Sequence, residues 1–386
     1  MKTTFCAAFN VIAACALQVV CGLVSARGAC DTFGQGVALG VVSIGGLQEA
    51  SGIAASRRNP GVLWVHNDGS SGVVHAVGMN GARLATFYLG WPVSDTEDIA
   101  VGPGPVAGQS YLYVGDIGRN KPKRDVQILR IPEPVVDPGW AGNPPTLFFS
   151  GVNGFTVSYP DGKYDAESLM VDPFSSDVFI VTKQSGGARV YRANFNFLAS
   201  GSQTFWGFVT SVPFGLVSGG DISADGSQIV LRREDYAQTW ERFNGEWIGT
   251  SLSRQGRGIP VIGPPREPNG EGIALLPDGS GYVTISEGVN PVLYFFEAQC
   301  PRHPVITVGL RNRRVVAGRK VTLGVRATGY PAPTYLWRLN GNIIPGETRR
   351  LLVLPNVSFS DEGEYMVTAM NPNGRVASRG RLTVVP

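Results

Sequence analysis

The chain has 386 residues, 43% hydrophobic and only 16% charged, so it is long enough for two or three domains and too apolar to be disordered. Its 51 glycines and 27 prolines stay below the share of a low-complexity chain and suit tight turns between short strands. The net charge of +3 is uneven, because residues 27–300 carry 19 basic and 26 acidic side chains (−7), whereas residues 301–386 carry 13 and 4 (+9). An acidic body followed by a basic segment suggests a charged partner.

Residues 1–26 have the features of a secretory signal peptide. Lys2 is the only early charge, an apolar run covers residues 11–24, and small residues follow at 24–26. We therefore expect a secreted, extracellular protein. No later stretch has the roughly 20 apolar residues that a membrane span needs. Removal of the signal leaves Cys30 and Cys300, and two cysteines in an exported protein usually pair.

A short phrase recurs five times in the body. In each copy an apolar run that begins near an acidic residue is followed by a second apolar run that ends in polar residues. The copies are Glu49–Asp68, Thr96–Asp116, Ala166–Lys183, Gly220–Arg232 and Gly270–Glu287. Short β-rich repeats at intervals of about 45–50 residues are typical of propeller blades. The sequence predicts an all-β fold with a β-propeller over residues 27–300, five-bladed, or six-bladed if the long interval between Ile99 and Leu169 hides another blade.

The last repeat runs out of strands before the propeller is complete. Gly36–Ser43, which precedes the first repeat, is apolar enough to be the missing outer strand. In the fourth repeat we expect the outer strand at Trp247–Leu252. Closing the ring with both ends of the body removes an exposed sheet edge, and it brings Cys30 beside Cys300. The sequence therefore predicts a disulfide that latches the ring.

The period changes beyond the predicted linker at 301–304. The features of this segment are Val321-Thr322-Leu323, Gly329-Tyr330-Pro331-Ala332-Pro333, Trp337, Asn340-Gly341 and Asp361-Glu362-Gly363-Glu364-Tyr365. Together they resemble an immunoglobulin domain of the I-set kind over residues 305–386. The resemblance implies a β-sandwich with Trp337 in its core and Tyr365 at its corner, and with Val325 and Val367 in place of the usual disulfide. Asn356 begins the sequon Asn-Val-Ser, which predicts an exposed glycosylation site.

Acidic residues should gather at one mouth of the propeller channel, because the first strands of all blades start on the same face. We expect Glu97, Glu167 and Glu271 to point there. Loop residues around them are the predicted ligand-binding set: His66, Asn67, Asp68, Asp116, Lys183 and Arg232. Converging carboxylates repel, so either their pKa values rise or a cation sits among them, and oxygen ligands favour calcium or magnesium. Alternatively, each acid bonds backbone amides of the neighbouring blade.

The repeats also resemble the secreted propellers of the phytase-like and gluconolactonase-like group. That resemblance implies calcium at the channel mouth and ester or phosphoester hydrolysis, and Glu271-Gly272 is the local match to the lactonase glutamate. No G-x-S-x-G elbow, zinc-ligand spacing or phosphate-binding glycine motif occurs, so we expect neither serine-hydrolase chemistry nor a nucleic-acid partner.

The basic segment predicts an anion-binding surface or, alternatively, a solvated face that only offsets the charge of the acidic body. Arg311 and Arg313 alternate on its first expected strand and Arg379 and Arg381 on its last, so the four could form one stripe. Our first hypothesis is a secreted recognition protein without catalytic residues, whose propeller face binds a ligand and whose basic domain engages an extracellular protein or an anionic glycan surface. The alternative is a calcium-dependent hydrolase with an immunoglobulin-like targeting domain.

Overall fold

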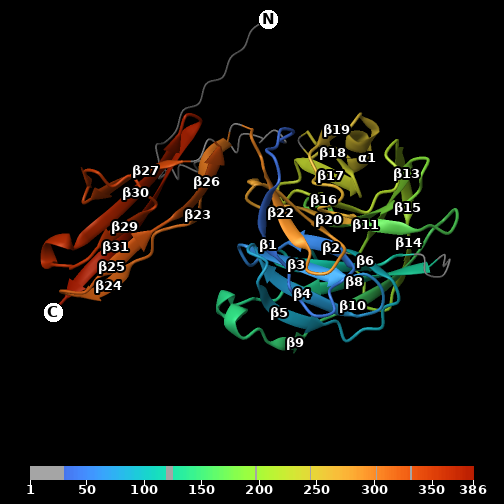
Figure 1. Ribbon diagram of the computed structural model, residues 1–386, viewed down its shortest axis with the longest axis horizontal. Helices are drawn as coiled ribbons and strands as arrows, with labels where there is room; N and C mark the ends of the chain where they lie inside the picture. The colour runs from blue at the N-terminus through green and yellow to red at the C-terminus, as the bar shows by residue number, and fades with distance from the viewer. Residues whose placement is uncertain (1–29, 119–124, 196–197, 244, 301, 331–332) are drawn as a thin grey trace, which may run out of the picture.

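The computed structural model describes residues 30–118, 125–195, 198–243, 245–300, 302–330 and 333–386, so the predicted signal peptide lies outside the described residues. Figure 1 shows a large body and a smaller, elongated unit, both built from strands, which confirms the all-β prediction. In these ranges the helical elements are short: α1 (Ile248–Ser253) and the 3-10 turns η1 (Pro138–Gly142) and η2 (Phe359–Asp361). None of the described helices is long and apolar enough to cross a membrane.

Five mainly antiparallel sheets form the body. The first contains β2 (Ala50–Ala55), β3 (Val62–Asn67), β4 (Val73–Gly78), β5 (Arg83–Tyr88) and β9 (Thr146–Phe148). The second contains β6 (Thr96–Pro103), β7 (Ser110–Asp116), β8 (Asp125–Pro132), β10 (Asn153–Ser158) and β14 (Gln203–Phe205). The third contains β11 (Ala166–Val171), β12 (Asp177–Thr182), β13 (Ala188–Asn194) and β15 (Gly207–Val212). The fourth contains β16 (Gly219–Ile222), β17 (Gln228–Arg233), β18 (Tyr236–Glu241) and β19 (Arg257–Ile259). The fifth contains β20 (Gly270–Leu275), β21 (Gly281–Ser286), β22 (Val292–Glu297) and β1 (Val37–Val41).

The first strands of the five sheets form a closed ring. Strand β2 packs on β6, β6 on β11, β11 on β16, β16 on β20, and β20 returns to β2. Every residue of β2 and β11 is buried, as expected for strands covered on both faces. Apolar side chains fill the space between successive sheets, as where Ile99 and Val101 of β6 join the cluster around Trp64 of β3. This packing fixes the start of each first strand near the axis of the ring.

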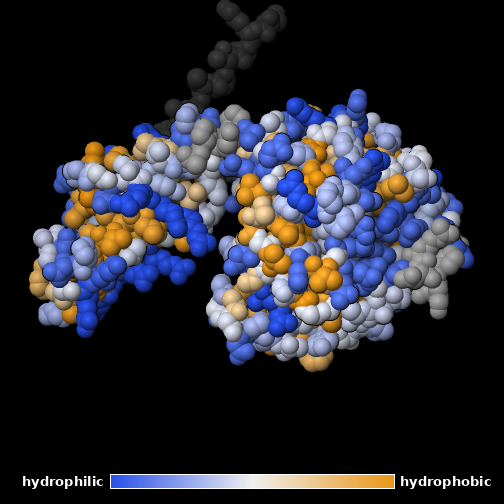
Figure 2. All heavy atoms as spheres, in the orientation of Figure 1, coloured by the Kyte–Doolittle hydropathy of each residue, from blue (hydrophilic) through white to orange (hydrophobic). Residues whose placement is uncertain are grey.

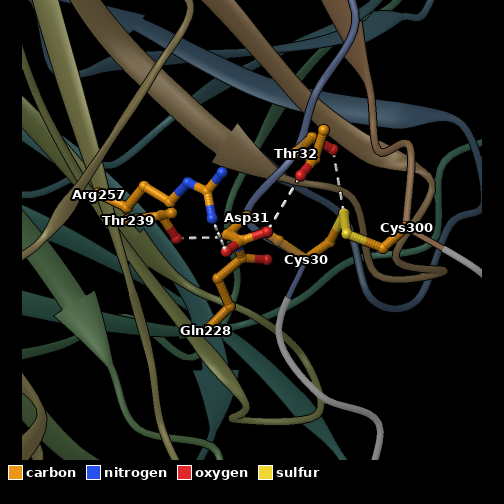
Figure 3. Close-up of a disulfide and its surroundings, with 7 residues drawn as sticks. All are labelled: Cys30, Asp31, Thr32, Gln228, Thr239, Arg257 and Cys300. Atoms are coloured by element: carbon orange, nitrogen blue, oxygen red, sulfur yellow. Dashed lines mark hydrogen bonds and ion pairs between the residues drawn. A yellow bond between two sulfur atoms is a disulfide. The ribbon is translucent and has the colours of Figure 1, made fainter.

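Both ends of the body build its last sheet. Strand β1 pairs antiparallel with β22, so the expected strand at Gly36–Ser43 is present in the expected place. Cys30 and Cys300 form the predicted disulfide, with 5.5 Å between their Cα atoms (Figure 3). Gln228 of the fourth sheet donates a hydrogen bond of 2.6 Å to the Cys30 carbonyl oxygen. The latch therefore joins the two ends to each other and to the neighbouring sheet.

Two segments differ from the expected strands. Trp247–Leu252 was the expected outer strand, but Ile248 and Leu252 lie four residues apart and are both buried, a helical spacing, and the segment forms most of α1. Strand β19 takes the outer place in the fourth sheet. The long interval after Ile99 supplies β9, which runs parallel to β5 at the edge of the first sheet, and the described residues of the body form five sheets rather than six.

The smaller unit is the predicted immunoglobulin-like sandwich. Its largest sheet contains β24 (Arg313–Val316), β31 (Gly374–Val385), β30 (Gly363–Asn371), β27 (Thr334–Leu339) and β28 (Asn342–Ile343). Two smaller pairs are β25 (Val321–Gly324) with β29 (Leu351–Leu354), and β23 (Arg302–Val308) with β26 (Arg326–Tyr330). Trp337 is fully buried, and the Tyr365 hydroxyl donates a hydrogen bond of 2.9 Å to the Asp361 carbonyl oxygen. Val325 and Val367 are buried in the same apolar core.

Candidate functional site

The three predicted channel glutamates share one backbone feature. Glu97 lies where β6 shifts its register against β7, Glu167 where β11 shifts against β12, and Glu271 where β20 shifts against β21. Such a β-bulge inserts one residue and re-aims its side chain. Each glutamate lies two residues before a buried isoleucine or leucine. The equivalent position is Ser51 in β2 and Gly220 in β16. The acids therefore come from three of the five sheets.

Asp98 of β6 and Asp221 of β16 have a different role. Each lies one residue after the position that holds a glutamate in β6, β11 and β20. Asp98 accepts hydrogen bonds of 2.8 Å from the Ile99 amide of its own strand and from the Leu169 amide of the next first strand. Asp221 does the same with Ile222 at 2.7 Å and Leu275 at 2.9 Å. Bonding of backbone amides between neighbouring sheets, the alternative considered for the acidic repeat, is therefore the role of these aspartates. Within the described part of the chain, the carboxylates of Glu97, Glu167 and Glu271 accept no such bond.

The glutamates lie in one electrostatic environment that disfavours their charged forms. Burial raises the pKa of Glu97, and the negative charges of Glu167 and Asp68 raise it further. Burial also raises the pKa of Glu167. Burial raises the pKa of Glu271 to about 8, although Lys183 opposes the shift. All three glutamate pKa values are thus shifted upward, which favours the protonated forms.

Lys183 brings a positive charge to this mouth. Its Nζ atom lies 2.6 Å from Glu167 Oε2. Burial lowers the Lys183 pKa, but the charges of Glu167, Glu271 and Glu97 outweigh burial and the net shift is upward. Lys183 was predicted as a ligand-binding residue from the loops, and the structure brings it between the acids of β11 and β20.

A second group lies on the other side of the mouth. Carboxylate oxygens of Asp68, Asp95 and Glu97 all lie within 4.8 Å of one another. Gly118 faces this group: a β-carbon placed on it would come within 1.9 Å of Glu97 Oε1 and 2.5 Å of Asp95 Oδ2. Burial and the Asp95 charge raise the pKa of Asp68 to about 6. Three carboxylates therefore converge on a space that only glycine leaves open.

The other predicted ligand residues of the first and second sheets organise loops. His66 is 1% exposed, its Nδ1 lies 2.9 Å from the Asn67 carbonyl oxygen, and burial lowers its pKa to about 4. The Asn67 side chain accepts hydrogen bonds from the backbone amides of Gln48 and Glu49. Asp116 holds the backbone amides of Ser94 and Asp95. Asp116 thereby positions one member of the acidic group.

Arg232 lies away from solvent. Its side chain is fully buried, donates to carbonyl oxygens of Gly272 and Glu234, and has Glu267 at 3.7 Å. These contacts use the guanidinium to join the fourth and fifth sheets. Arg232 is therefore a packing residue in this structure, and its Nη2 atom fills the space that a side chain on Gly270 would need.

Sequence reasoning missed Asp95, Asp165 and Asn269. Each lies two residues before a channel glutamate, so the three copies read Asp95-x-Glu97, Asp165-x-Glu167 and Asn269-x-Glu271. The charge of Asp165 acts on Glu167, and Asn269 donates a hydrogen bond of 2.6 Å to Glu287. The signal that would have found them is this D/N-x-E spacing, which occurs in the same three sheets that carry the glutamates.

Two pockets flank the acidic mouth. One, of about 630 Å³, is lined by Asp95, Asp116 and Gly118. The other, of about 690 Å³, is lined by Lys183, Glu271 and Glu287. Both leave room beside the carboxylates for a bound molecule.

The four predicted arginines of the sandwich do not share one face. Arg379 and Arg381 are exposed on the outward side of β31. Arg313 pairs with the buried Leu382 and so has the opposite parity, and Arg311 precedes β24. Arg375 joins the outward side instead, and Arg338 lies in register with Arg379 through Met366. Figure 2 shows hydrophilic residues beside an apolar patch on the visible face of this unit. The sequon residue Asn356 is exposed.

Comparison with known proteins concerns the sandwich. Residues 303–371 match the family described as Immunoglobulin domain. Contactin-2 of Mus musculus is 40% identical over 72 residues, which are 18% of this chain and 7% of contactin-2. Neural cell adhesion molecule L1.1 of Danio rerio is 29% identical over 116 residues, 28% of this chain and 10% of that protein. The solved titin domain M7 is 30% identical over 22% of this chain and 98% of its own, with a TM-score of 0.22. Residues 303–371 thus form an immunoglobulin-like domain, and the chain spans a tenth or less of these two curated relatives.

Proposed function

We propose that the protein is an exported recognition protein with two binding surfaces. In this proposal residues 27–300 are a five-bladed propeller whose acidic mouth binds a ligand, and residues 305–386 engage an extracellular protein or an anionic glycan. The immunoglobulin-domain match carries the proposal, because one relative of that segment is named as a neural cell adhesion molecule. The closed ring of first strands and the two pockets at the mouth support a ligand-binding body.

The ligand of the mouth is cationic or holds a cation. Glu97, Glu167 and Glu271, with Asp68 beside them, place several carboxylates near one lysine. At about 6 Å, two such charges repel by roughly 0.7 kcal/mol even in water, and more where water is excluded. A calcium ion would offset that repulsion and could coordinate an oxygen of the bound ligand.

The basic surface is tested with matched variants. We expect the full-length protein to bind a sulfated-glycan column and to elute at raised salt. Changing Arg375, Arg379 and Arg381 together to Ser should abolish most retention if the outward face binds. Changing Arg313, Arg349 and Arg350 to Ser removes the same charge away from the outward side of β31 and is the control. Equal losses from both variants, or no retention of the parent, would contradict a defined polyanion site.

A second function is a calcium-dependent hydrolase. The unequal groups around the mouth favour it: three of the five sheets supply a glutamate, and Lys183 lies beside one of them. A catalytic site needs such different groups around one point. Glu271 has a buried oxygen, Oε2, that finds no hydrogen-bond partner among the described residues, a pKa raised to about 8, and the Lys183 charge nearby. Such a carboxyl could donate a proton near neutral pH. Lactones and phosphate esters are the substrates to assay. Calcium-dependent turnover that Glu271→Gln abolishes would establish this function, and its absence would favour the binding protein.

A further inference from the structure

A further pocket lies at the end of the body opposite to the acidic mouth. Strand β16 starts at the mouth, and β17 and β18 follow it in alternating directions, so β18 ends at the far side of the ring. A pocket of about 250 Å³ opens there, between the end of β18 and the disulfide. Asp31 and Arg257, drawn beside Cys30 in Figure 3, line it together with Cys30. The residues after β18 that line it include Phe243, Arg254 and Gln255.

The cations of this pocket are paired within the chain. Arg257 forms an ion pair with Asp31, and Arg254 forms one with Glu246. Arg254 also donates a hydrogen bond of 2.5 Å to the Glu241 carbonyl oxygen. Because each guanidinium already has its carboxylate, the pocket offers no free positive charge to an anionic ligand.

Three side chains of the pocket are available to a ligand. Glu241 and Gln255 bring a carboxylate and an amide, and neither side chain bonds another residue in the described part of the chain. The carboxylate accepts hydrogen bonds, and the amide both donates and accepts them. The Phe243 ring is 53% exposed, with the Arg254 Cζ atom 5.2 Å from its centroid. Arg254 therefore holds the ring in place while much of its apolar surface stays open.

The segment that carries these groups is fixed to the fourth sheet. The Trp240 indole nitrogen donates a hydrogen bond of 3.0 Å to the Arg254 carbonyl oxygen. A β-carbon on Gly256 would come within 2.6 Å of the Trp240 ring, so only glycine lets the chain pass there. Gln228 holds the Cys30 carbonyl oxygen on the other side. Groups that are fixed before a ligand arrives lose less entropy when it binds.

We propose that this pocket binds a neutral sugar ring, as a site separate from both surfaces of the proposed function. A pyranose ring carries C–H groups on its faces, which pack on an aromatic ring, and hydroxyl groups around its edge, which bond planar polar side chains. Phe243 supplies the first contact, and Glu241 and Gln255 supply the second. A sulfated or uronic sugar would bring a negative charge to Glu241. A wholly apolar ligand would bury Glu241 and Gln255 without hydrogen bonds.

Occupation of the pocket should also protect the disulfide. Cys30 lines the pocket, so a bound ring covers the part of the chain where the disulfide is made. Dithiothreitol reduces a disulfide by direct attack of its thiolate on a sulfur atom, which requires access. A ligand that binds only the disulfide-closed form also stabilises that form by mass action. Reduction should therefore be severalfold slower at a saturating sugar concentration.

The test is calorimetric titration of the full-length, disulfide-bonded protein with methyl glycosides of neutral hexoses and N-acetylhexosamines. We expect at least one to bind, and the matching uronic acid glycoside to bind about tenfold more weakly or less. Phe243→Ala should weaken binding by about tenfold or more, and Gln255→Ala by about threefold to tenfold. Phe174→Ala is the matched control, because Phe174 is also exposed beneath an arginine, Arg242, but does not line the pocket.

The outcomes separate a sugar site from its alternatives. Binding that Phe243→Ala weakens and Phe174→Ala does not, together with slower reduction of the disulfide, supports the site. Two arms then distinguish the source of the sugar: equal affinity for the glycoside and for a disaccharide ending in it supports a single ring, and tighter binding of the disaccharide supports a glycan chain.

Three results would overturn the site. They are no binding by any neutral glycoside of the panel, equal binding by the parent and Phe243→Ala, and binding that leaves the reduction rate unchanged. The acidic mouth and the basic sandwich are tested by the hydrolysis assays and the sulfated-glycan column, so failure here is distinguishable from failure of the proposed function.

Discussion

The body and the sandwich close their folds in opposite ways. The body brings the two ends of one long segment together in its fifth sheet and bonds them through Cys30 and Cys300. The sandwich has Val325 and Val367 where an immunoglobulin domain usually carries its disulfide, and it is held by packing around Trp337. The last sheet of the ring needs both ends of the body, so it is lost if one end detaches. The strands of the sandwich are closer together in the sequence, so no pairing there spans so long a segment. A covalent link is therefore found where chain closure costs most entropy.

The largest expected effect is on the body. Cys30→Ser with Cys300→Ser opens a loop with a sequence separation of 270 residues. The loop-entropy relation gives a loss of roughly 5–6 kcal/mol in the free energy of unfolding. Calorimetry should show the body transition at a lower temperature and the sandwich transition unchanged. A parallel fall of both transitions would show that the two units do not unfold independently.

The converse change gives the sandwich the link that it lacks. Val325→Cys with Val367→Cys would close a loop of about 40 residues, worth up to about 4 kcal/mol before the lost valine packing is subtracted. We expect a rise in the sandwich transition under oxidising conditions that disappears with a reductant. The single variant Val367→Cys is the control, and it should be slightly destabilised in both conditions. A double variant that forms no disulfide would mean that these side chains do not face each other.

Acid should distinguish the two units through a buried histidine of the body. Burial lowers the pKa of His75 to about 4 from its usual 6.5. The unfolded chain therefore binds a proton that the folded chain refuses, and stability falls as pH drops from 6.5 to 4, by up to about 3 kcal/mol. His75→Gln keeps a partner for Thr86 but does not titrate, so the difference in melting temperature between parent and variant should change across this range. A constant difference would contradict a buried, neutral His75.

The smallest effect separates the two kinds of acid in the body. Asp98→Asn leaves one acceptor oxygen for two backbone amides, Ile99 and Leu169, and should cost about 1–3 kcal/mol. Glu97→Gln, at the neighbouring residue, removes a charge without hydrogen bonds and should not destabilise metal-free protein. Denaturant unfolding at neutral pH measures both. Similar losses in the two variants would contradict the division of roles between the aspartates and the glutamates.

The repeats were enough to predict the first strands, the closing strand and the disulfide, because apolar runs and cysteine positions follow directly from chain order. They left open whether the acids of the repeats face the mouth or bond backbone amides of the neighbouring sheet. Glu97 and Asp98 are adjacent, and only a bulge, which hydrogen-bond register defines, sends one to the mouth and the other to the backbone. Arg232 looked like a loop cation, but its pairing with Gly219 at the start of the fourth sheet places it inside. Arg379 and Arg381 share one side of β31, as predicted. Arg313 does not join them, because β24 runs parallel to β31 with Arg313 opposite the buried Leu382.

The position of the disulfide also determines how the chain would carry a mechanical load. Tension applied between the segment before Cys30 and the sandwich passes through the sulfur–sulfur bond, because the sandwich begins directly after Cys300. The five sheets between the two cysteines are bypassed and experience no stretching. The sandwich receives the force. Its strands β24 and β31 are parallel neighbours, so tension between the two ends of the sandwich loads all hydrogen bonds between these strands at once. Anchored at both ends, the molecule would extend at its sandwich while the acidic mouth kept its shape.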